Sequence, residues 1–327
     1  MSGEVLPIAV SCGDPAGIGP ELAVMAHGQL GAGLPFVWIG DPRHLPEHAN
    51  PQPLDDARDA PAAAARGLPV LPMDFPAARR PGTLDPRNAD ATVAAIERGV
   101  LEVREGRCAA LCTLPIQKET LIEGADFPFP GHTEFLAHLT GAEHEVMMLV
   151  GEGLRVVPAT IHLPLAGVPE ALARIDLART IRIAAHSLRQ DFGIAAPRIA
   201  VAGLNPHAGE GGKIGREEIE LIAPALESCR ADGIDVRGPL SADTMFHPAA
   251  RADYDLAVCM YHDQALIPIK TVDFAGGVNV TLGLPIVRTS PDHGTALGIA
   301  GTGTADPTSF VNALLLADGM ARARGRA

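Results

Sequence analysis

Three histidines in this 327-residue chain follow apolar runs that are typical of buried strands. They stand in Ile161-His162, Asn205-Pro206-His207 and Tyr261-His262, too far apart for a local metal motif. Each is weak evidence by itself. Because open α/β sheets gather polar groups beyond the carboxyl ends of their strands, the three imidazoles could converge on one divalent ion. Imidazole ligands suit zinc, cobalt or nickel.

Two cations and an amide follow the third histidine within one stretch of chain, at Lys270, Asn279 and Arg288. Two fixed cations within about twenty residues favour an anionic substrate, because they can pair with its charge. The alternative for each is a solvated surface charge. The segment Pro130-Gly131-His132-Thr133-Glu134 opens a predicted helix, and the N–H groups there form a second candidate anion site. An ordinary N-cap at Thr133 is the alternative.

Predicted strands and helices alternate along the chain and would position these residues. The strands are expected near residues 5–11, 35–39, 69–72, 108–113, 146–150, 154–160, 198–204 and 256–260. Helices are expected at 176–192, capped by Asp176, and at 216–231, with a kink at Pro224. This alternation predicts an α/β fold with mostly parallel sheets flanked by helices. Gly151-Glu152-Gly153 predicts a hairpin, and residues 50–87 predict loops without chemistry.

Two glycine-rich segments fail the usual nucleotide-binding patterns. Gly17 and Gly19 are followed by Leu22, where the dinucleotide fingerprint of a Rossmann fold requires a third glycine. Gly212-Lys213 lacks both the earlier glycine and the following Ser or Thr of a phosphate loop. Neither segment therefore carries a standard nucleotide-binding motif.

The bulk composition excludes several classes of protein. A net charge of −13 argues against a nucleic-acid surface, and no apolar run is long enough for a membrane span. The N-terminal segment lacks a basic n-region and a cleavage site, so we expect a cytoplasmic protein. Five cysteines without Cys-x-x-Cys spacing argue against a disulfide framework, and buried free thiols are expected at Cys108, Cys112 and Cys259. Histidines without a motif are expected at the surface: His27, His44, His48 and His247.

Several motifs together resemble the 4-hydroxythreonine-4-phosphate dehydrogenase family of pyridoxal phosphate biosynthesis. They are GDPAGIGPE (13–21), GHTE (131–134), HLPL (162–165), GLNPHAGEGG (203–212), YHDQ (261–264) and NVTLGLPIVRTSPDHGTALGIAGTGTAD (279–306). The segment from His293 to Pro307 is also similar to the cofactor loop of isocitrate and isopropylmalate dehydrogenases. The resemblance implies their two-lobed fold, which is not a Rossmann fold, and a homodimer with the active site at the interface. The expected lobes are a cofactor-side lobe, 1–127 with 276–327, and a metal, substrate and dimerisation lobe, 128–275.

The resemblance also implies a role for each matched residue. The metal ligands would be His162, His207 and His262, holding one zinc, cobalt or magnesium ion. Substrate contacts would be His132, Thr133, Lys270, Asn279 and Arg288, with Asp243, Asp263 and Lys270 as catalytic groups. NAD or NADP would bind at His293, Gly294, Thr295, Ala296 and Asp306. Gln117 stands where many members of the family have a smaller Asn or Ala.

The reaction implied by the resemblance is oxidation of 4-phosphohydroxy-L-threonine to 2-amino-3-oxo-4-phosphooxybutanoate. That product then decarboxylates to 3-amino-2-oxopropyl phosphate. One alternative is a paralogue acting on 4-phospho-D-threonate or 4-phospho-D-erythronate in sugar-acid catabolism, which would use the same residues. A more remote alternative is a non-catalytic phosphate-binding protein, which predicts the loss of a metal ligand or a cation. All of these residues are present here.

Overall fold

The computed structural model describes residues 5–326, and the chain divides into two compact units. Unit 1 is Met1–Glu145 with Leu284–Ala327, and unit 2 is Val146–Gly283. These bounds differ from those of the expected lobes. Helix α5 (His132–Thr140) belongs to unit 1, where it packs on α3 (Ala89–Arg104), and strand β11 (Val278–Leu282) belongs to unit 2, where it pairs with β6 (Val146–Gly151). The cofactor-side and metal-side roles of the lobes stay a prediction.

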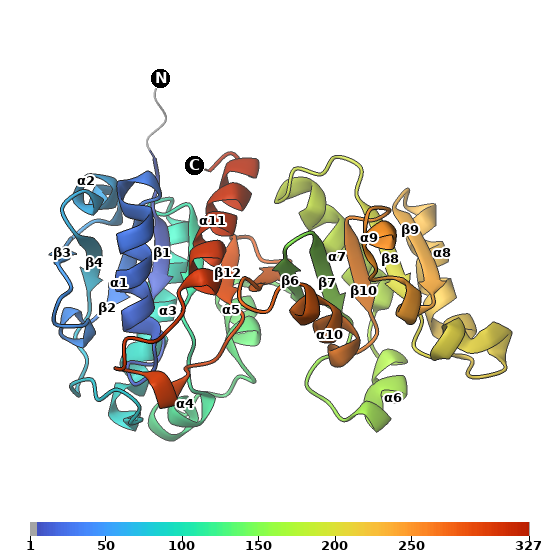
Figure 1. The fold of residues 1–327 in the computed structure, drawn as a ribbon, viewed down its shortest axis with the longest axis horizontal. Coiled ribbons are helices and arrows are strands. Elements are labelled where there is room, and N and C mark those ends of the chain that lie inside the picture. Colours follow the sequence, from blue (N-terminus) through green and yellow to red (C-terminus); the bar gives the residue numbers. More distant parts are fainter. Residues whose placement is uncertain (1–4, 327) are drawn as a thin grey trace. The chain divides into compact units, whose positions relative to one another are not determined.

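Unit 1 contains a parallel sheet with the strand order β3-β4-β2-β1-β5-β12. Most of its strands are apolar and buried along their whole length, as expected for strands covered on both faces. Helix α3 packs on β1, β2 and β5, and α11 packs on β12, β5 and β1 (Figure 1). The strands are β1 (Ile8–Ser11), β2 (Phe36–Gly40), β3 (Pro51–Pro53), β4 (Leu68–Pro72), β5 (Ala110–Thr113) and β12 (Arg288–Pro291). The other helices are α1 (Gly19–Leu30), α2 (Ala60–Ala64), α4 (Lys118–Ala125) and α11 (Thr308–Ala323).

Unit 2 contains the strand order β11-β6-β7-β10-β8-β9. Its four last strands run parallel, and β6 is antiparallel to both β11 and β7. The predicted hairpin at Gly151-Glu152-Gly153 is confirmed, because it joins β6 to β7. The remaining strands are β7 (Leu154–Pro158), β8 (Arg198–Ala202), β9 (Asp235–Leu240) and β10 (Leu256–Cys259). The helices are α6 (Val168–Leu172), α7 (Leu177–Gln190), α8 (Ala223–Ala231), α9 (Pro248–Arg251) and α10 (His262–Val272).

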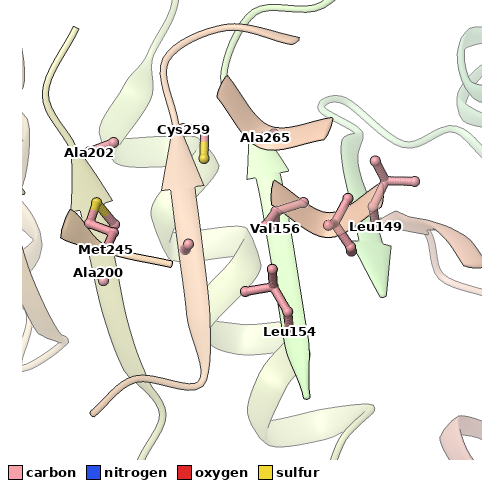
Figure 2. Packing of buried hydrophobic residues seen from close by; sticks show 10 residues of the cluster. Leu149, Leu154, Val156, Ala200, Ala202, Met245, Cys259 and Ala265 are labelled. Carbon is pink, nitrogen blue, oxygen red and sulfur yellow. The ribbon is translucent and has the colours of Figure 1, made fainter. Parts of the chain in front are cut away.

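The core of unit 2 shows the period of two that a pleated sheet imposes. Figure 2 shows side chains from neighbouring strands on one face, among them Leu154 and Val156 of β7 and Ala200 and Ala202 of β8. Ala265 of α10 covers this face, with Met245 and Leu149 beside it (Figure 2). Helix α10 packs on β7, β6 and β10.

Local features confirm some predictions and correct one. The Asp176 carboxylate accepts the N–H of Arg179 at 2.8 Å and caps α7, as predicted. A π-helical turn, Glu218–Ile222, precedes α8, which has Pro224 in its first turn, and the kink at Pro224 stays a prediction. The predicted surface position of His44 is wrong. The residue is 2% exposed and its ring nitrogen lies 3.0 Å from the carbonyl oxygen of Ala77, because the segment after β4 folds over it.

All five cysteines are buried and free, including the three predicted ones. Among residues 5–326, no helix has both the length and the apolar character needed to cross a bilayer.

Candidate functional site

The three motif histidines follow three neighbouring parallel strands of unit 2. Strand β10 pairs with β7 on one side and with β8 on the other, in parallel register. His162 follows β7, His262 opens α10 directly after β10, and His207 follows β8. Since the carboxyl ends of parallel strands meet at one edge, all three histidines belong to the same edge of this sheet.

A hydrogen-bond network ties these strand ends together. The Gln264 side chain accepts the N–H of Met260 at 2.6 Å and donates to the carbonyl of Gly203 at 2.8 Å, so it links β10 to β8. The Thr160 hydroxyl donates to the carbonyl of Met260 at 2.7 Å and links β7 to β10. Thr160 and Gln264 are both buried. Groups on these loops are therefore held by rigid supports, as a functional site requires.

His162 and His262 are brought together. Their ring centroids lie 5.9 Å apart with the planes tilted by 45°, and both side chains line a cavity of about 450 Å³. The Nδ1 atom of His262 lies 2.7 Å from Oδ1 of Asp263. A carboxylate at Nδ1 favours the tautomer that leaves Nε2 available as a ligand. The pair and its carboxylate fit part of a divalent-metal site.

His207 stands on an unusual loop after β8. The backbone is left-handed from His207 to Gly211, with φ of 51° at His207, 51° at Ala208 and 46° at Glu210. Such conformations cost non-glycine residues about 1–3 kcal/mol each and persist only where their surroundings enforce them. Among residues 5–326, no three His, Cys, Asp or Glu side chains are arranged to hold one metal ion. The role of His207 as a third ligand stays a prediction.

A buried carboxylate enforces this loop. Glu218, 3% exposed, accepts the backbone N–H of Asn205 at 2.7 Å and its side-chain amide at 3.0 Å. A Cβ at Gly209 would lie 2.6 Å from the Glu218 carboxylate, so the turn can close on Glu218 only with glycine at that position. The sequence shows Glu218 as one of several acidic residues at the start of a helix, which gives no sign of this role.

The other predicted residues of unit 2 belong to three different elements. Lys270 is half-buried on α10, with its Nζ atom 5.6 Å from the centre of the Phe274 ring. Asn279 lies on β11, and its buried Oδ1 has no hydrogen-bond partner among the described residues. Asp243 is exposed and accepts the hydroxyl of Ser241 at 2.6 Å. The catalytic roles of Asp243, Asp263 and Lys270 stay predictions.

In unit 1, a buried arginine, Arg288, lies near His132 at the start of helix α5. Arg288, the first residue of β12, is 3% exposed and donates to the Thr113 hydroxyl from Nη2 at 2.6 Å. Burial lowers its pKa to about 10. His132 begins α5, and its buried Nε2 has no hydrogen-bond partner among residues 5–326. Thr133 lies half-buried in the same first turn. A guanidinium and free N–H groups at a helix start suit a phosphate group. Thr113, at the end of a predicted strand, was not predicted to take part.

His132 makes stability depend on pH. Burial, and secondarily the charge of Arg288, hold its pKa well below the usual value. Below about pH 6.5 the unfolded chain binds a proton at this imidazole and the folded protein does not, so the free energy of unfolding falls as pH drops. The contribution reaches about 1.4 kcal/mol per pH unit. In urea unfolding between about pH 7 and pH 5, the free energy of unfolding is expected to fall less for His132→Asn than for the wild-type protein. The exposed His186→Asn is the control, and equal slopes for all three proteins would contradict the prediction.

The loop between β12 and α11 contains the predicted cofactor residues. The Thr295 carbonyl accepts the N–H of Ile18 at 3.0 Å, and its hydroxyl donates to Gln117 at 3.3 Å. Asp306 accepts the N–H and the hydroxyl of Thr308, contacts that lower the pKa of its carboxyl. A ring nitrogen of His293 lies 2.9 Å from the carbonyl oxygen of Gly294. Ala296 is left-handed, with φ of 49°. The loop thus rests on the glycine-rich turn that follows β1.

Residues 50–87 were predicted to lack chemistry, yet one side chain from this segment is connected to the same loop through Glu21. Arg79, with 9% of its side chain exposed, pairs with Glu21 at 2.6 Å. Glu21 in turn accepts the N–H of Gly301. The sequence signal was an arginine pair before Pro81-Gly82 in a segment with weak periodicity.

Comparison with known proteins agrees with this architecture. The model of a family described as "Pyridoxal phosphate biosynthetic protein PdxA" matches residues 34–317. The 4-hydroxythreonine-4-phosphate dehydrogenase of Ruegeria sp. (strain TM1040) is 56% identical over 99% of both chains. That of Paracoccus denitrificans is also 56% identical, over 98% of this chain and 99% of its own. The crystal structure of the Klebsiella pneumoniae enzyme has a TM-score of 0.87 at 39% identity, covering 98% of this chain and 99% of that one.

The protein is thus of the α/β class that these enzymes share, with mostly parallel strands flanked by helices, and the predicted fold class is confirmed. The chain belongs to the PdxA family of pyridoxal phosphate biosynthetic proteins, as the motifs in its sequence indicated.

Proposed function

We propose that the protein oxidises 4-phosphohydroxy-L-threonine with NAD or NADP, as a 4-hydroxythreonine-4-phosphate dehydrogenase of pyridoxal 5'-phosphate biosynthesis. The observation that carries this proposal is the pair His162 and His262 beside Asp263, at the edge of a parallel sheet. The chain is 56% identical over nearly its whole length to enzymes of that name. The product, 2-amino-3-oxo-4-phosphooxybutanoate, is a β-keto acid and would decarboxylate to 3-amino-2-oxopropyl phosphate.

The phosphate of the substrate would bind at Arg288 in unit 1. The guanidinium is charged at neutral pH, because its lowered pKa of about 10 still lies well above that range. The neutral His132 can donate from Nε2 without adding a second buried positive charge. Thr133 and the N–H groups at the start of α5 complete an anion site. Lys270 and Asn279 remain the predicted contacts for the rest of the substrate.

His162, His262 and, by resemblance to the family, His207 would hold the divalent metal ion. When bound, such an ion lowers the pKa of a substrate hydroxyl and stabilises the negative charge that decarboxylation leaves. Asp263 holds His262 in the tautomer with its Nε2 lone pair directed away from the carboxylate. Lys270 and Asp243 are the candidates for taking the hydroxyl proton and for returning a proton after carbon dioxide leaves.

The nicotinamide cofactor would bind at the loop from His293 to Asp306, which would take its adenosine half. The residues from Gly301 to Thr304 are exposed, and the exposed Asp306 offers a carboxylate. The proposed homodimer is supported by large apolar side chains that unit 2 leaves exposed: Leu165 at 67%, Ile267 at 64% and Phe274 at 79%. Exposed apolar groups of this size commonly mark an interaction surface.

The test is NADH or NADPH formation by the purified protein with added divalent metal. 4-Phosphohydroxy-L-threonine and 4-phospho-D-threonate would be compared side by side, with and without a chelator. Faster turnover of the L-threonine derivative, abolished by the chelator, is expected. Preference for 4-phospho-D-threonate would instead assign the protein to sugar-acid catabolism, and Gln117, which contacts Thr295, would be the first position to exchange. No turnover of either compound would refute the proposal.

A further inference from the structure

We propose that Arg79 is a positioning residue for the cofactor loop, acting through Glu21 to fix the backbone near Gly301. The inference rests on the proposed function in one respect, namely that the loop from His293 to Asp306 receives the nicotinamide cofactor. Arg79 lies on the connection between β4 and α3, far from the loop in the sequence. All of the residues involved belong to unit 1.

Arg79 makes three directed hydrogen bonds in a nearly buried position. Its Nε donates to the carbonyl of Pro15 at 2.8 Å, and its Nη2 donates to the carbonyl of Gly17 at 3.1 Å. The same Nη2 donates to Oε1 of Glu21 at 2.6 Å. Only 9% of the Arg79 side chain and 7% of the Glu21 side chain are exposed. A planar guanidinium can reach acceptors in several directions at once, whereas a lysine ammonium on a flexible stem cannot hold them all.

Glu21 passes this restraint to the loop. Its Oε1, which accepts from Arg79, also accepts the backbone N–H of Gly301 at 2.6 Å. Its Oε2 is buried and has no hydrogen-bond partner among the described residues. A buried carboxylate is strongly disfavoured without a charged partner, so Arg79 is what allows Glu21 to remain under the loop.

Close backbone approaches show that the loop and the Arg79 segment are fitted to each other. A Cβ on Gly301, where φ is 80°, would lie 2.7 Å from Cβ of Pro81. The N–H of Gly82 donates to the carbonyl of Ala16 at 2.8 Å, so the Arg79 segment is also joined to the turn after β1. The loop itself has little regular structure beyond a short 3-10 turn, Leu297–Ile299, and its residues from Gly301 to Thr304 are exposed. Its conformation therefore depends on these few attachments.

Loss of Arg79 would leave Glu21 free to turn away. A cavity of about 410 Å³ lies beside both side chains and Gly301, and it gives the carboxylate room to reach water. The Gly301 N–H would then lose its acceptor, and the loop would sample other conformations. A cofactor that must first order its binding loop binds more weakly, in proportion to the fraction of protein in the competent form. Arg79 donates its hydrogen bonds to Pro15, Gly17 and Glu21, none of which is a predicted substrate or metal contact, so substrate affinity and the chemical step would be retained.

The experiment compares Arg79→Ala, Arg79→Lys and Glu21→Gln with the full-length wild-type protein. NADH and NADPH binding is measured by calorimetric titration. The kcat and the KM values for the oxidised cofactor and for the phosphorylated substrate are measured from NADH or NADPH formation. For Arg79→Ala we expect the cofactor Kd and KM to rise about tenfold or more, with kcat at saturating cofactor and the KM for the phosphorylated substrate within about twofold. Arg79→Lys should bind the cofactor more tightly than Arg79→Ala but more weakly than the wild type. Glu21→Gln keeps an oxygen that can accept the Gly301 N–H, so its cofactor Kd should also lie between those of the wild type and Arg79→Ala.

Arg87→Ala is the matched control. Arg87 is an arginine of the same unit that pairs with Asp85 at 2.6 Å, but 66% of its side chain is exposed, so its removal should leave all constants unchanged. Amide hydrogen exchange supplies a readout that does not depend on turnover. Peptides covering residues 295–304 should exchange faster in Arg79→Ala, whereas peptides covering β5 should not change.

Each outcome decides the inference. Unchanged cofactor binding and unchanged exchange in Arg79→Ala would overturn it, as would an equal loss in KM for both substrates. If Arg79→Ala does not fold, Arg79→Lys and Glu21→Gln decide, and wild-type cofactor affinity in both would overturn it. A wild-type protein that binds NADH but does not turn over would refute the proposed reaction alone, and the Kd values would still test Arg79. A wild-type protein that binds neither cofactor would overturn both.

Discussion

Replacing His262 with alanine is expected to lower kcat at least about a hundredfold and to remove the bound divalent metal. The substitution removes a residue predicted to bind the metal directly. Loss of a residue that only hydrogen-bonds to a metal ligand already lowers metal affinity or activity by about 10–100-fold, so loss of the ligand itself should have at least the larger of these effects. The fold should survive, because 36% of the His262 side chain is exposed and a surface substitution usually changes stability by about 0.5 kcal/mol or less. Metal content by elemental analysis, kcat and the urea midpoint would be measured on the same preparations.

Two further variants sharpen this test. His186→Ala removes an exposed histidine from α7 in the same unit and should change neither metal content nor kcat. His207→Ala addresses the third predicted ligand, which lies on the left-handed turn after β8. Metal loss in His207→Ala equal to that in His262→Ala would establish His207 as a ligand. Full activity of metal-stripped wild-type protein would show that the histidines serve another purpose.

Replacing Arg288 with methionine is expected to lower kcat/KM for the phosphorylated substrate by about a thousandfold. Hydrogen bonds between charged groups contribute about 1.5–3 kcal/mol each, and a guanidinium makes two to a phosphate. Burial disfavours the charge of Arg288, as its pKa of about 10 shows, and a bound dianion would offset that cost. Inorganic phosphate should therefore raise the Tm of the wild-type protein and leave that of Arg288→Met unchanged.

The controls for Arg288 separate charge from geometry. Arg288→Lys keeps a cation but loses the planar fork, so it should recover only part of the phosphate effect. Thr113→Val removes the hydroxyl that accepts from Arg288 and should have a smaller effect than loss of the guanidinium. Because the guanidinium loses its proton as pH rises through about 10, phosphate binding by the wild-type protein should weaken above that pH. A phosphate-dependent Tm in Arg288→Met equal to that of the wild type would contradict the assignment.

The local features of this protein could be predicted from its sequence, because each depends on residues close together in the chain. Apolar runs and helical periodicity gave the alternation of strands and helices, and Gly151-Glu152-Gly153 gave the hairpin. Asp176 was recognised as a cap because the capping contact joins it to Arg179, only a turn away. The histidines at the ends of predicted strands and the glycine-rich segments were visible as motifs, and they sufficed to identify the family.

Tertiary structure decided which of these features meet. The strand order places β10 between β7 and β8, which gathers three histidines at one sheet edge and brings the rings of His162 and His262 to a centroid distance of 5.9 Å. His44 is buried although its sequence surroundings suggest a surface loop. Arg79 binds Glu21 across two unrelated segments. Contacts of this kind depend on the packing of distant segments and on a few directed hydrogen bonds, which leave no periodic pattern in a single sequence.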